Sequence, residues 1–455
     1  MTDGPSLSTA LAQWATGLDP ADIPSTAVRR HLLDAIGCAV AAARHDAAGP
    51  ALAVAAADGD GPCMVPGTDL SLPAPAAALA TGVLIHALDF DDTHAGGLVH
   101  ASAPVVATAL AVGQDQRRSG QEVLHAATVG LEVICRLAAA VPHGYHRAGF
   151  HATSVCGAPA AALVAALLTG ADTATAAHAI GIAVSTAAGS LEFLADGAST
   201  KQLHPGFAAR DGITAARLAA AGATGPATAL EGRHGLFALY TGQRVDPAAV
   251  TDGLGTRWEA TQITLKPYPA CQLVHAGLDA VADAMGDQRL TPTEVEDVEV
   301  EVHPDAVDVV CEPSWAKRRP RTPYDAKFSL QWTIAAAIVD GVVAVDAFQP
   351  NQLRRRDLAA VAERVRHTVV PREGLVAAAA PSRVHIRTTD GTVRTGAVRS
   401  SRGGPDTPLD DDALTAKFLA NVGDANRAGA IRRAVDSVAN APTLDDLLGA
   451  TRPTR

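Results

Sequence analysis

The feature that most constrains this fold is the spacing of apolar residues over the first 265 residues. The stretch "STAVRRHLLDAIGCAVAAA" repeats apolar residues at helical intervals, with Ser25 as the expected N-cap. Because alanine is abundant and aromatic residues make up only 4% of the chain, we expect closely packed helices with small side chains at their contacts. Similar alanine-rich stretches, mostly separated by glycine or proline, predict helices at about residues 75–88, 103–113, 120–140, 157–169, 173–188 and 207–221.

The pattern changes after Pro267. In "EVEDVEVEV", valines alternate with acidic residues, which predicts a strand with one buried face. "RVHIRTTDGTVRTGAV" predicts a hairpin that turns at Asp390-Gly391. Helical patterns lie at roughly 325–339 and 351–366, and helix returns in "LDDDALTAKFLANVG" and "ANRAGAIRRAVDSVANA".

These patterns predict a mainly α chain with three parts. Residues 1–267 form a large all-helical domain, and residues 268–404 form a smaller inserted α+β lid domain. Residues 405–455 are C-terminal helices that return to the helical domain.

Composition excludes several classes of function. The chain has 455 residues, 48% of them apolar and 19% charged, so it is globular and long enough for more than one domain. A net charge of −11 without a basic stripe argues against a nucleic-acid partner. Six scattered cysteines without a CxxC pair, and no recognisable signal peptide, suggest a cytoplasmic protein. The apolar runs are too short for a membrane span.

The stretch "HALDFDDTH" places three carboxylates and two imidazoles directly after the apolar run "APAAALATGVLI". If helix continues through it, His86, Asp89 and Thr93 share one face, while Asp91 and His94 point elsewhere. A carboxylate with a hydroxyl one turn away can orient an imidazole or hold a substrate hydroxyl. Two other interpretations stay open: the acids cap a loop beside a core histidine, or they bind a metal.

Three further stretches place a polar or cationic group just before an alanine-rich helix. His100 precedes Ser102, an expected N-cap, and His151 precedes the run "ATSVCGAPAAALVAAL". Lys201 and His204 precede the helix predicted at about residues 207–221. Each histidine alone is more often structural, but helix N-termini suit carboxylates, and the recurrence favours an anion site.

A fourth stretch, "LKPYPACQLVHAGLDAV", contains Lys266 and His275 where the helical region gives way to the mixed one. Domain junctions favour clefts, which makes these two residues candidates for a binding site. The two prolines also fit a rigid linker.

Four motifs in this order, "DxDDTH", "GFHxT", "TKxLHPGxAAxxGxxAAxLA" and "KPYPxCxxxHxxLDA", resemble the MmgE/PrpD family. That family contains 2-methylcitrate dehydratase, cis-aconitate decarboxylase and iminodisuccinate epimerase. "DIPSTAVRRHLLDAIGCAVAAA", "DAKFSLQWTIAAAIVDG" and "AKFLANV" extend the resemblance over nearly the whole chain. The resemblance implies a homodimer that needs neither metal nor organic cofactor, with its site in the crevice between the helical domain and the lid.

The resemblance also implies site residues. The catalytic set is Asp89, Thr93, His100, Tyr145, His151, Lys201 and His275. The substrate-binding candidates are His204 and Lys266, from the residue patterns above, and Gln272 and Trp332, from positions where the chain departs from the family. Trp332 stands where the decarboxylase branch has a tyrosine, and Gln202 and Gln272 stand where many members carry arginine, which favours a substrate with fewer or differently placed carboxylates.

We therefore expect a lyase that acts on a small anionic polycarboxylate through a carbanion or enolate, stabilised by Lys201 and histidines. Dehydration stands ahead of decarboxylation in this prediction. The alternative is an epimerase that uses Tyr145 and Lys201 as two bases. A metal-dependent hydrolase and a homologue without activity are the remaining alternatives.

Overall fold

The computed structural model describes residues 4–453 and confirms a mainly α protein. The chain divides into two compact units, which are described separately. Unit 1 runs to Leu191 and continues through Thr200–Ile263 and from Asp410 onward. Unit 2 consists of Glu192–Ser199 and Thr264–Leu409. In the part of the chain that the structure describes, no helix has the length and apolar character needed to cross a membrane.

Unit 1 is built from helices whose buried faces are dominated by alanine, valine and leucine. Its central helices α4, α5, α6, α8 and α10 pack against one another. The helices of unit 1 are α1 (Leu7–Gly17), α2 (Ser25–Arg44), α3 (Gly49–Ala56), α4 (Ala74–His86), α5 (Ser102–Asp115), α6 (Gly120–Ala139), α7 (Gly144–Arg147), α8 (Ala152–Leu168), α9 (Thr173–Val184), α10 (Thr200–Ala220), α11 (Leu236–Thr241), α12 (Ala248–Thr251), α18 (Asp411–Val422), α19 (Ala425–Asp436) and α20 (Asp445–Ala450). Three short strands, β1 (Cys63–Met64), β2 (Ser71–Leu72) and β3 (Thr93–His94), lie between them in the chain.

Glycine allows a close helix contact in unit 1, between α4 and α10. A Cβ added to Gly82 would lie 2.9 Å from the Cα of Gly206, and one added to Gly206 would lie 2.5 Å from the carbonyl oxygen of Leu79. No larger residue fits there unless a backbone moves. This contact fixes the C-terminal end of α4 beside the N-terminal end of α10.

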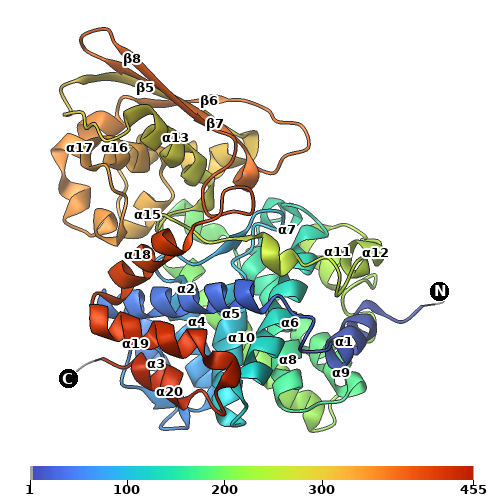
Figure 1. Cartoon of the computed structure of the whole chain (residues 1–455). Coiled ribbons are helices and arrows are strands. Elements are labelled where there is room, and N and C mark those ends of the chain that lie inside the picture. The colour runs from blue at the N-terminus through green and yellow to red at the C-terminus, as the bar shows by residue number, and fades with distance from the viewer. Residues whose placement is uncertain (1–3, 454–455) are drawn as a thin grey trace. The chain divides into compact units, whose positions relative to one another are not determined.

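The C-terminal helices belong to the same compact unit as the N-terminal ones. α18 and α19 pack against α2, and α20 packs against α19, as the red and blue ribbons of Figure 1 show. A side chain of α18 can therefore reach residues that are far away in sequence.

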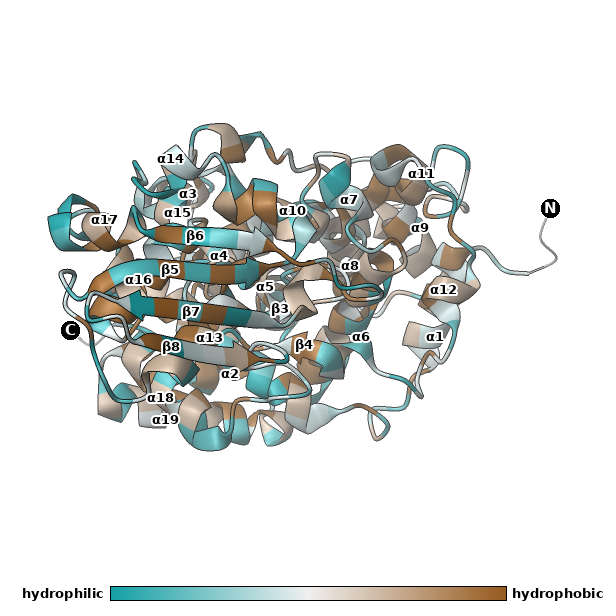
Figure 2. Cartoon of the chain, turned by 90° about the horizontal axis from the view of Figure 1, so that it is seen from above, coloured by the Kyte–Doolittle hydropathy of each residue, from teal (hydrophilic) through white to brown (hydrophobic). Residues whose placement is uncertain are grey.

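Unit 2 is an α+β structure around one four-stranded sheet. The strand order is β6-β5-β7-β8, with β5 and β6 parallel and the other pairs antiparallel. Figure 2 shows the strands side by side, with hydrophilic and hydrophobic residues alternating along β5. Helices α13 and α16 pack on the sheet. The elements are β5 (Val295–Val302), β6 (Val365–Val369), β7 (Ser382–Thr388), β8 (Val393–Val398), α13 (His275–Met285), α14 (Ser314–Lys317), α15 (Pro323–Lys327), α16 (Leu330–Asp340) and α17 (Arg356–Ala362).

Two strand predictions are confirmed. β5 buries Val298, Val300 and Val302, and a register shift between Val295 and Asp297 explains why its first buried valine is out of phase. β7 and β8 form the expected hairpin, in which the Asp390 side chain accepts a hydrogen bond from Thr392 N at 3.0 Å.

Several predicted helix boundaries are wrong. Ser25 and Ser102 are the first residues of α2 and α5, and neither is an N-cap. The helix expected over 351–366 ends at Ala362, because Val365 begins β6 and pairs with Val298. Here sheet pairing overrides the local helical pattern.

Candidate active site

The stretch after α4 is not the continuous helix that the sequence suggested. α4 ends at His86, and Asp89 adopts a left-handed conformation with φ 51°. Aspartate tolerates this region better than most residues, but it does not continue a right-handed helix. The chain turns back, so Asp91, which we expected to point elsewhere, meets His86. The His86 Nδ1 lies 2.9 and 2.8 Å from the two carboxylate oxygens of Asp91.

Lys201 connects this turn to α10. That helix begins at Thr200, so Lys201 and His204 lie in its first turns, and the prediction that they precede the helix is wrong. The Lys201 Nζ lies 3.0 Å from Asp89 Oδ1 and 3.3 Å from His100 Nε2. All three side chains are buried. An ammonium in such a place is stabilised by its carboxylate, and it can direct its N–H groups only toward a few partners.

His100 is held in one tautomer by its neighbours. Its Nδ1 lies 2.9 Å from the carbonyl oxygen of Asp92, which can only accept a hydrogen bond, and 3.2 Å from Thr93 Oγ1. The proton therefore lies on Nδ1, and Nε2 accepts a hydrogen bond from the Lys201 ammonium. The backbone N–H of His100 donates to Thr153 Oγ1 at 3.0 Å, which connects the turn to the start of α8.

His151 is the N-cap residue of α8, as its place before the helix predicted. Its Nδ1 lies 3.1 Å from the Nδ1 of His204, and its ring centroid lies 5.8 Å from those of His86 and His100. Because two facing ring nitrogens share one hydrogen bond, one of the rings donates and the other accepts.

Burial and the nearby Lys201 keep these histidines neutral. The pKa of His151 lies well below its ordinary value because the ring is buried and Lys201 is close. Burial lowers the pKa of His204 to about 4, and the neighbouring His86 and Lys201 add to the effect. Burial also lowers the pKa of His86, although the Asp91 carboxylate opposes the change. These shifts favour the uncharged imidazole of His86, His151 and His204 at neutral pH.

A second layer of buried polar groups supports the turn. Asp92 accepts hydrogen bonds from Ser102 N at 3.1 Å and Ser102 Oγ at 2.5 Å, and His31 Nδ1 lies 2.9 Å from it. Burial raises the pKa of Asp92, but the hydrogen bonds from His31 and Ser102 outweigh it and keep the pKa below the ordinary value. Asp92 is thus an ionised anchor at the start of α5.

Lys417 of α18 anchors the same turn from the other end of the chain. Its Nζ lies 2.6 Å from Asp34 of α2, donates to the carbonyl oxygen of Phe90 at 2.9 Å, and lies 4.0 Å from the centroid of the Phe90 ring. These contacts fix the residue directly after Asp89.

The sequence prediction did not include Asp34, Asp91, Asp92 or Lys417, and it considered His86 without assigning it to the site. The available signals were the acidic run itself and a lysine inside "AKFLANV". Neither signal reveals a partner that is far away in sequence.

Six predicted site residues thus come together in unit 1: Asp89, Thr93, His100, His151, Lys201 and His204. Tyr145 is in the same unit, on α7, where its hydroxyl donates to the carbonyl oxygen of Leu137 at 3.2 Å. Burial raises the pKa of Tyr145 well above its ordinary value.

The other four predicted residues belong to unit 2. His275 begins α13, and its Nε2 lies 3.1 Å from the carbonyl oxygen of Ala270. The Gln272 amide donates to Ser401 Oγ at 2.9 Å. Lys266 and Trp332 are buried.

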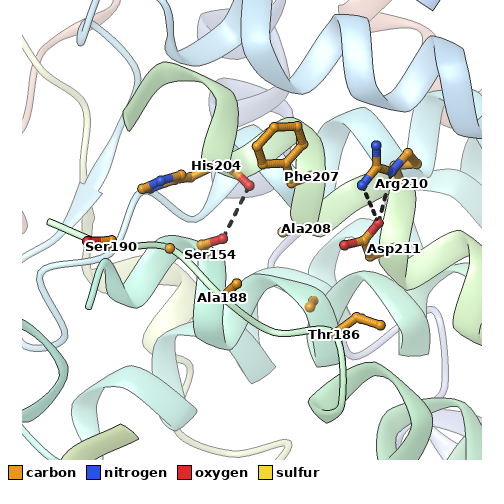
Figure 3. A pocket seen from close by; sticks show the side chains of 11 residues that line it. Ser154, Thr186, Ala188, Ser190, His204, Phe207, Ala208, Arg210 and Asp211 are labelled. Carbon is orange, nitrogen blue, oxygen red and sulfur yellow. Dashed lines mark hydrogen bonds and ion pairs between the residues drawn. The ribbon is translucent and has the colours of Figure 1, made fainter. Parts of the chain in front are cut away.

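A hollow of about 250 Å³ lies beside the cluster in unit 1. Figure 3 shows that it reaches the backbone of His204, whose carbonyl oxygen accepts a hydrogen bond from Ser154 Oγ at 3.5 Å. The His204 ring points away from Phe207 and from the Arg210–Asp211 pair on the other side of the hollow. The hollow therefore contacts the cluster through His204.

The cluster also contains donor types that divalent metals use. His86, Asp89, Asp91 and His100 each offer one ligand atom, and these atoms lie within 4.8 Å of one another. The Lys201 ammonium, 3.0 Å from Asp89, already supplies a positive charge at this place. Because a dication and an ammonium repel each other, we do not assign these residues as metal ligands.

Comparison with known proteins agrees with the motifs. The family model of the MmgE/PrpD N-terminal domain matches residues 9–247, and that of the C-terminal domain matches residues 268–440. The chain is 27% identical to a cis-aconitate decarboxylase of Aspergillus terreus over 97% of this chain and 94% of that protein. It is 29% identical to the cis-aconitate decarboxylase of Homo sapiens over 83% of this chain and 79% of that protein. A cis-aconitate decarboxylase-like protein of Aspergillus oryzae is 26% identical over 97% of this chain and 96% of that protein.

Proposed function

This chain belongs to the MmgE/PrpD family, and on that premise we propose that it is a lyase that decarboxylates a small unsaturated polycarboxylate. The observation that carries the proposal is the position of Lys201, whose Nζ lies between Asp89 and His100 in a buried cluster. From the sequence we placed dehydration first. Because several relatives are cis-aconitate decarboxylases, we now favour decarboxylation.

The proposed chemistry follows from the charge distribution. When carbon dioxide leaves, the electron pair of the broken C–C bond stays on the substrate as a carbanion conjugated with a carboxylate. Such an intermediate needs positive charge fixed in place beforehand and a proton donor within reach. Lys201 supplies both, because it is charged and buried, and it is surrounded by imidazoles that burial keeps neutral.

The neighbours of Lys201 direct its proton. Asp89 and His100 each accept a hydrogen bond from the ammonium, which restricts the directions in which its N–H groups can point. In the proposed mechanism the ammonium transfers a proton to the carbanion, so a C–H bond forms as an N–H bond breaks. Lysine is left as a neutral amine that must regain a proton before the next turnover.

Thr93 and His151 complete the proposed site. Thr93 Oγ1 lies 3.2 Å from His100 Nδ1 and can hold that ring in place or bind a substrate hydroxyl. His151 is the N-cap residue of α8, whose N-terminal N–H groups favour a carboxylate. The residues of unit 2, with His275 first among them, remain predicted contributors to this site.

The epimerase alternative requires Tyr145 as a base. Its hydroxyl donates to Leu137, and burial raises its pKa, so the phenolate that a base requires is costly to form. No contact of Tyr145 favours this function over decarboxylation, and it is retained as an outcome of the test.

The test is a panel of small di- and tricarboxylic acids incubated with the protein in deuterated water and followed by NMR. We expect one acid to lose a carboxylate and to gain one deuterium at the adjacent carbon. An unsaturated product formed without carbon dioxide would indicate dehydration. Deuterium in otherwise unchanged substrate would indicate epimerisation, and no change in any acid would contradict a lyase.

A further inference from the structure

His86 is a buried residue of the cluster to which neither the family resemblance nor the proposed mechanism assigns a role. It is the last residue of α4 and is completely buried. Its Nδ1 lies 2.9 and 2.8 Å from the two oxygens of Asp91, which is also completely buried. Because a carboxylate accepts, the ring proton lies on Nδ1.

The other nitrogen of His86 is then a bare acceptor. Among the described residues, Nε2 has no hydrogen-bond partner, although it is buried. A buried polar atom without a partner is uncommon and often marks a functional group. An imidazole with a carboxylate at one nitrogen and an open second nitrogen is suited to take up a proton, because the carboxylate stabilises the imidazolium that forms.

His86 lies within the cluster. Its ring centroid is 4.5 Å from that of His100 and 5.8 Å from that of His151. One ring nitrogen of each of these three histidines lies within 4.8 Å of the others. His100 in turn accepts a hydrogen bond from Lys201.

Several titratable and charged groups surround His86. They are Asp89 and Asp91 from the turn, His100 before α5, His151 before α8, and Lys201 and His204 from α10. The positive charge of Lys201 opposes protonation of His86 while Lys201 carries its proton, and this opposition disappears when the lysine becomes neutral.

We propose that His86, supported by Asp91, is a proton-relay residue that reloads Lys201 after each turnover. This inference rests on the proposed function, in which Lys201 gives its proton to the substrate. After that step, Nε2 of His86 takes a proton from a water molecule that enters the cluster, the hydroxide left behind returns to bulk solvent, and an imidazolium forms beside Asp91. The proton then passes through the cluster to the Lys201 amine, the N–H bond on Nε2 breaks, and the ring returns to its neutral form. No electrons are exchanged in these steps.

The test compares His86→Gln with His146→Gln. His146 is a matched control, because burial lowers its pKa to about 3 and its ring lies 6.2 Å from that of His151. In rapid-mixing experiments with the acid that the panel identifies, we expect His86→Gln to release about one equivalent of carbon dioxide per site at the wild-type rate. Steady-state turnover should then be about tenfold slower or more, because reloading is impaired. The control should retain the wild-type steady state.

Other outcomes would overturn the relay. A wild-type steady state in His86→Gln would show that reloading does not use His86. Loss of the first turnover as well would give His86 a direct or structural role. Asp91→Asn preserves the shape of the pair and serves as the second variant. It should show the same burst with a smaller loss.

A measurement without substrate separates this inference from the proposed function. In protein labelled with ¹⁵N at histidine, His86 and His100 should both show a protonated Nδ1 and an unprotonated Nε2 at neutral pH, and His86→Gln should remove the signals of one such ring. Asp91→Asn should shift the ¹⁵N signals of His86. A protonated Nε2 on His86 would contradict the relay whether or not any acid is decarboxylated, whereas an inactive wild-type protein with the expected tautomer would contradict the proposed function alone.

Discussion

The Lys201 Nζ lies 3.0 Å from Asp89 Oδ1, and the carboxylate is completely buried on a residue with left-handed backbone conformation. The α4–α10 glycine contact brings these two residues together, and Lys417 holds the residue between Asp89 and Asp91. Contacts on both sides therefore fix the relative position of Lys201 and Asp89.

Removal of one partner of this pair should cost stability as well as activity. In Lys201→Met, Asp89 becomes a buried charge without its cation, and we expect the free energy of unfolding to fall by about 3 kcal/mol. The double variant Lys201→Met/Asp89→Asn should recover part of that loss while remaining inactive. Urea denaturation measures the free energy of unfolding of the single and the double variant. Equal stability of the single and double variants would contradict coupling between the two residues.

Lys417 of α18, which holds the carbonyl group of Phe90, should affect activity through the neighbouring Asp89. Lys417→Met leaves Asp34 buried and unpaired and releases the carbonyl of Phe90, so we expect a loss of about 3 kcal/mol in stability. Below the melting temperature of the variant, kcat should still fall, because the turn is less ordered. Leu419→Ala, on an exposed position of the same helix, is the control and should change neither quantity. A Lys417→Met variant with wild-type kcat would show that the anchor serves stability alone.

The glycine contact between α4 and α10 should tolerate no side chain. In Gly206→Ala, the new Cβ lies 2.5 Å from the carbonyl oxygen of Leu79, so the helices must separate, at a cost of about 1–3 kcal/mol. The same shift moves Lys201 and should lower kcat/KM. Gly449→Ala, where the added Cβ meets nothing within 4 Å, should be neutral or slightly stabilising in the same thermal unfolding assay. Identical melting temperatures for the two variants would contradict this close packing.

The neutral histidines make stability depend on pH in a defined direction. An unfolded histidine titrates near pH 6.5, roughly, whereas His204 in the folded protein titrates at about 4. Between these values, the unfolded chain binds a proton that the native state does not, so the free energy of unfolding falls as the pH falls. Denaturation curves measured across this window should show a shallower slope for His204→Gln than for the wild type. An unchanged slope would contradict a neutral His204.

The helical character of the chain and the β7–β8 hairpin could be predicted from the sequence, because both depend on local residue patterns. The sequence did not predict the end of α4 at His86, because the conformation of Asp89 depends on contacts with residues far away in sequence. For the same reason, the role of Lys417 was not visible. The catalytic roles, the place of His275 in the site, the lid and the homodimer stay predictions.

The most direct test of the central claim is the rate of carbon dioxide release by Lys201→Met at saturating substrate. Lys317→Met is the matched control, because Lys317 is a partly buried lysine of unit 2 that donates to the backbone of Val309 and Phe328. We predict a fall in kcat of about 10³-fold for Lys201→Met and a rate close to the wild type for Lys317→Met. A rate for Lys201→Met within about tenfold of the wild type would contradict the assignment of Lys201 as the proton donor.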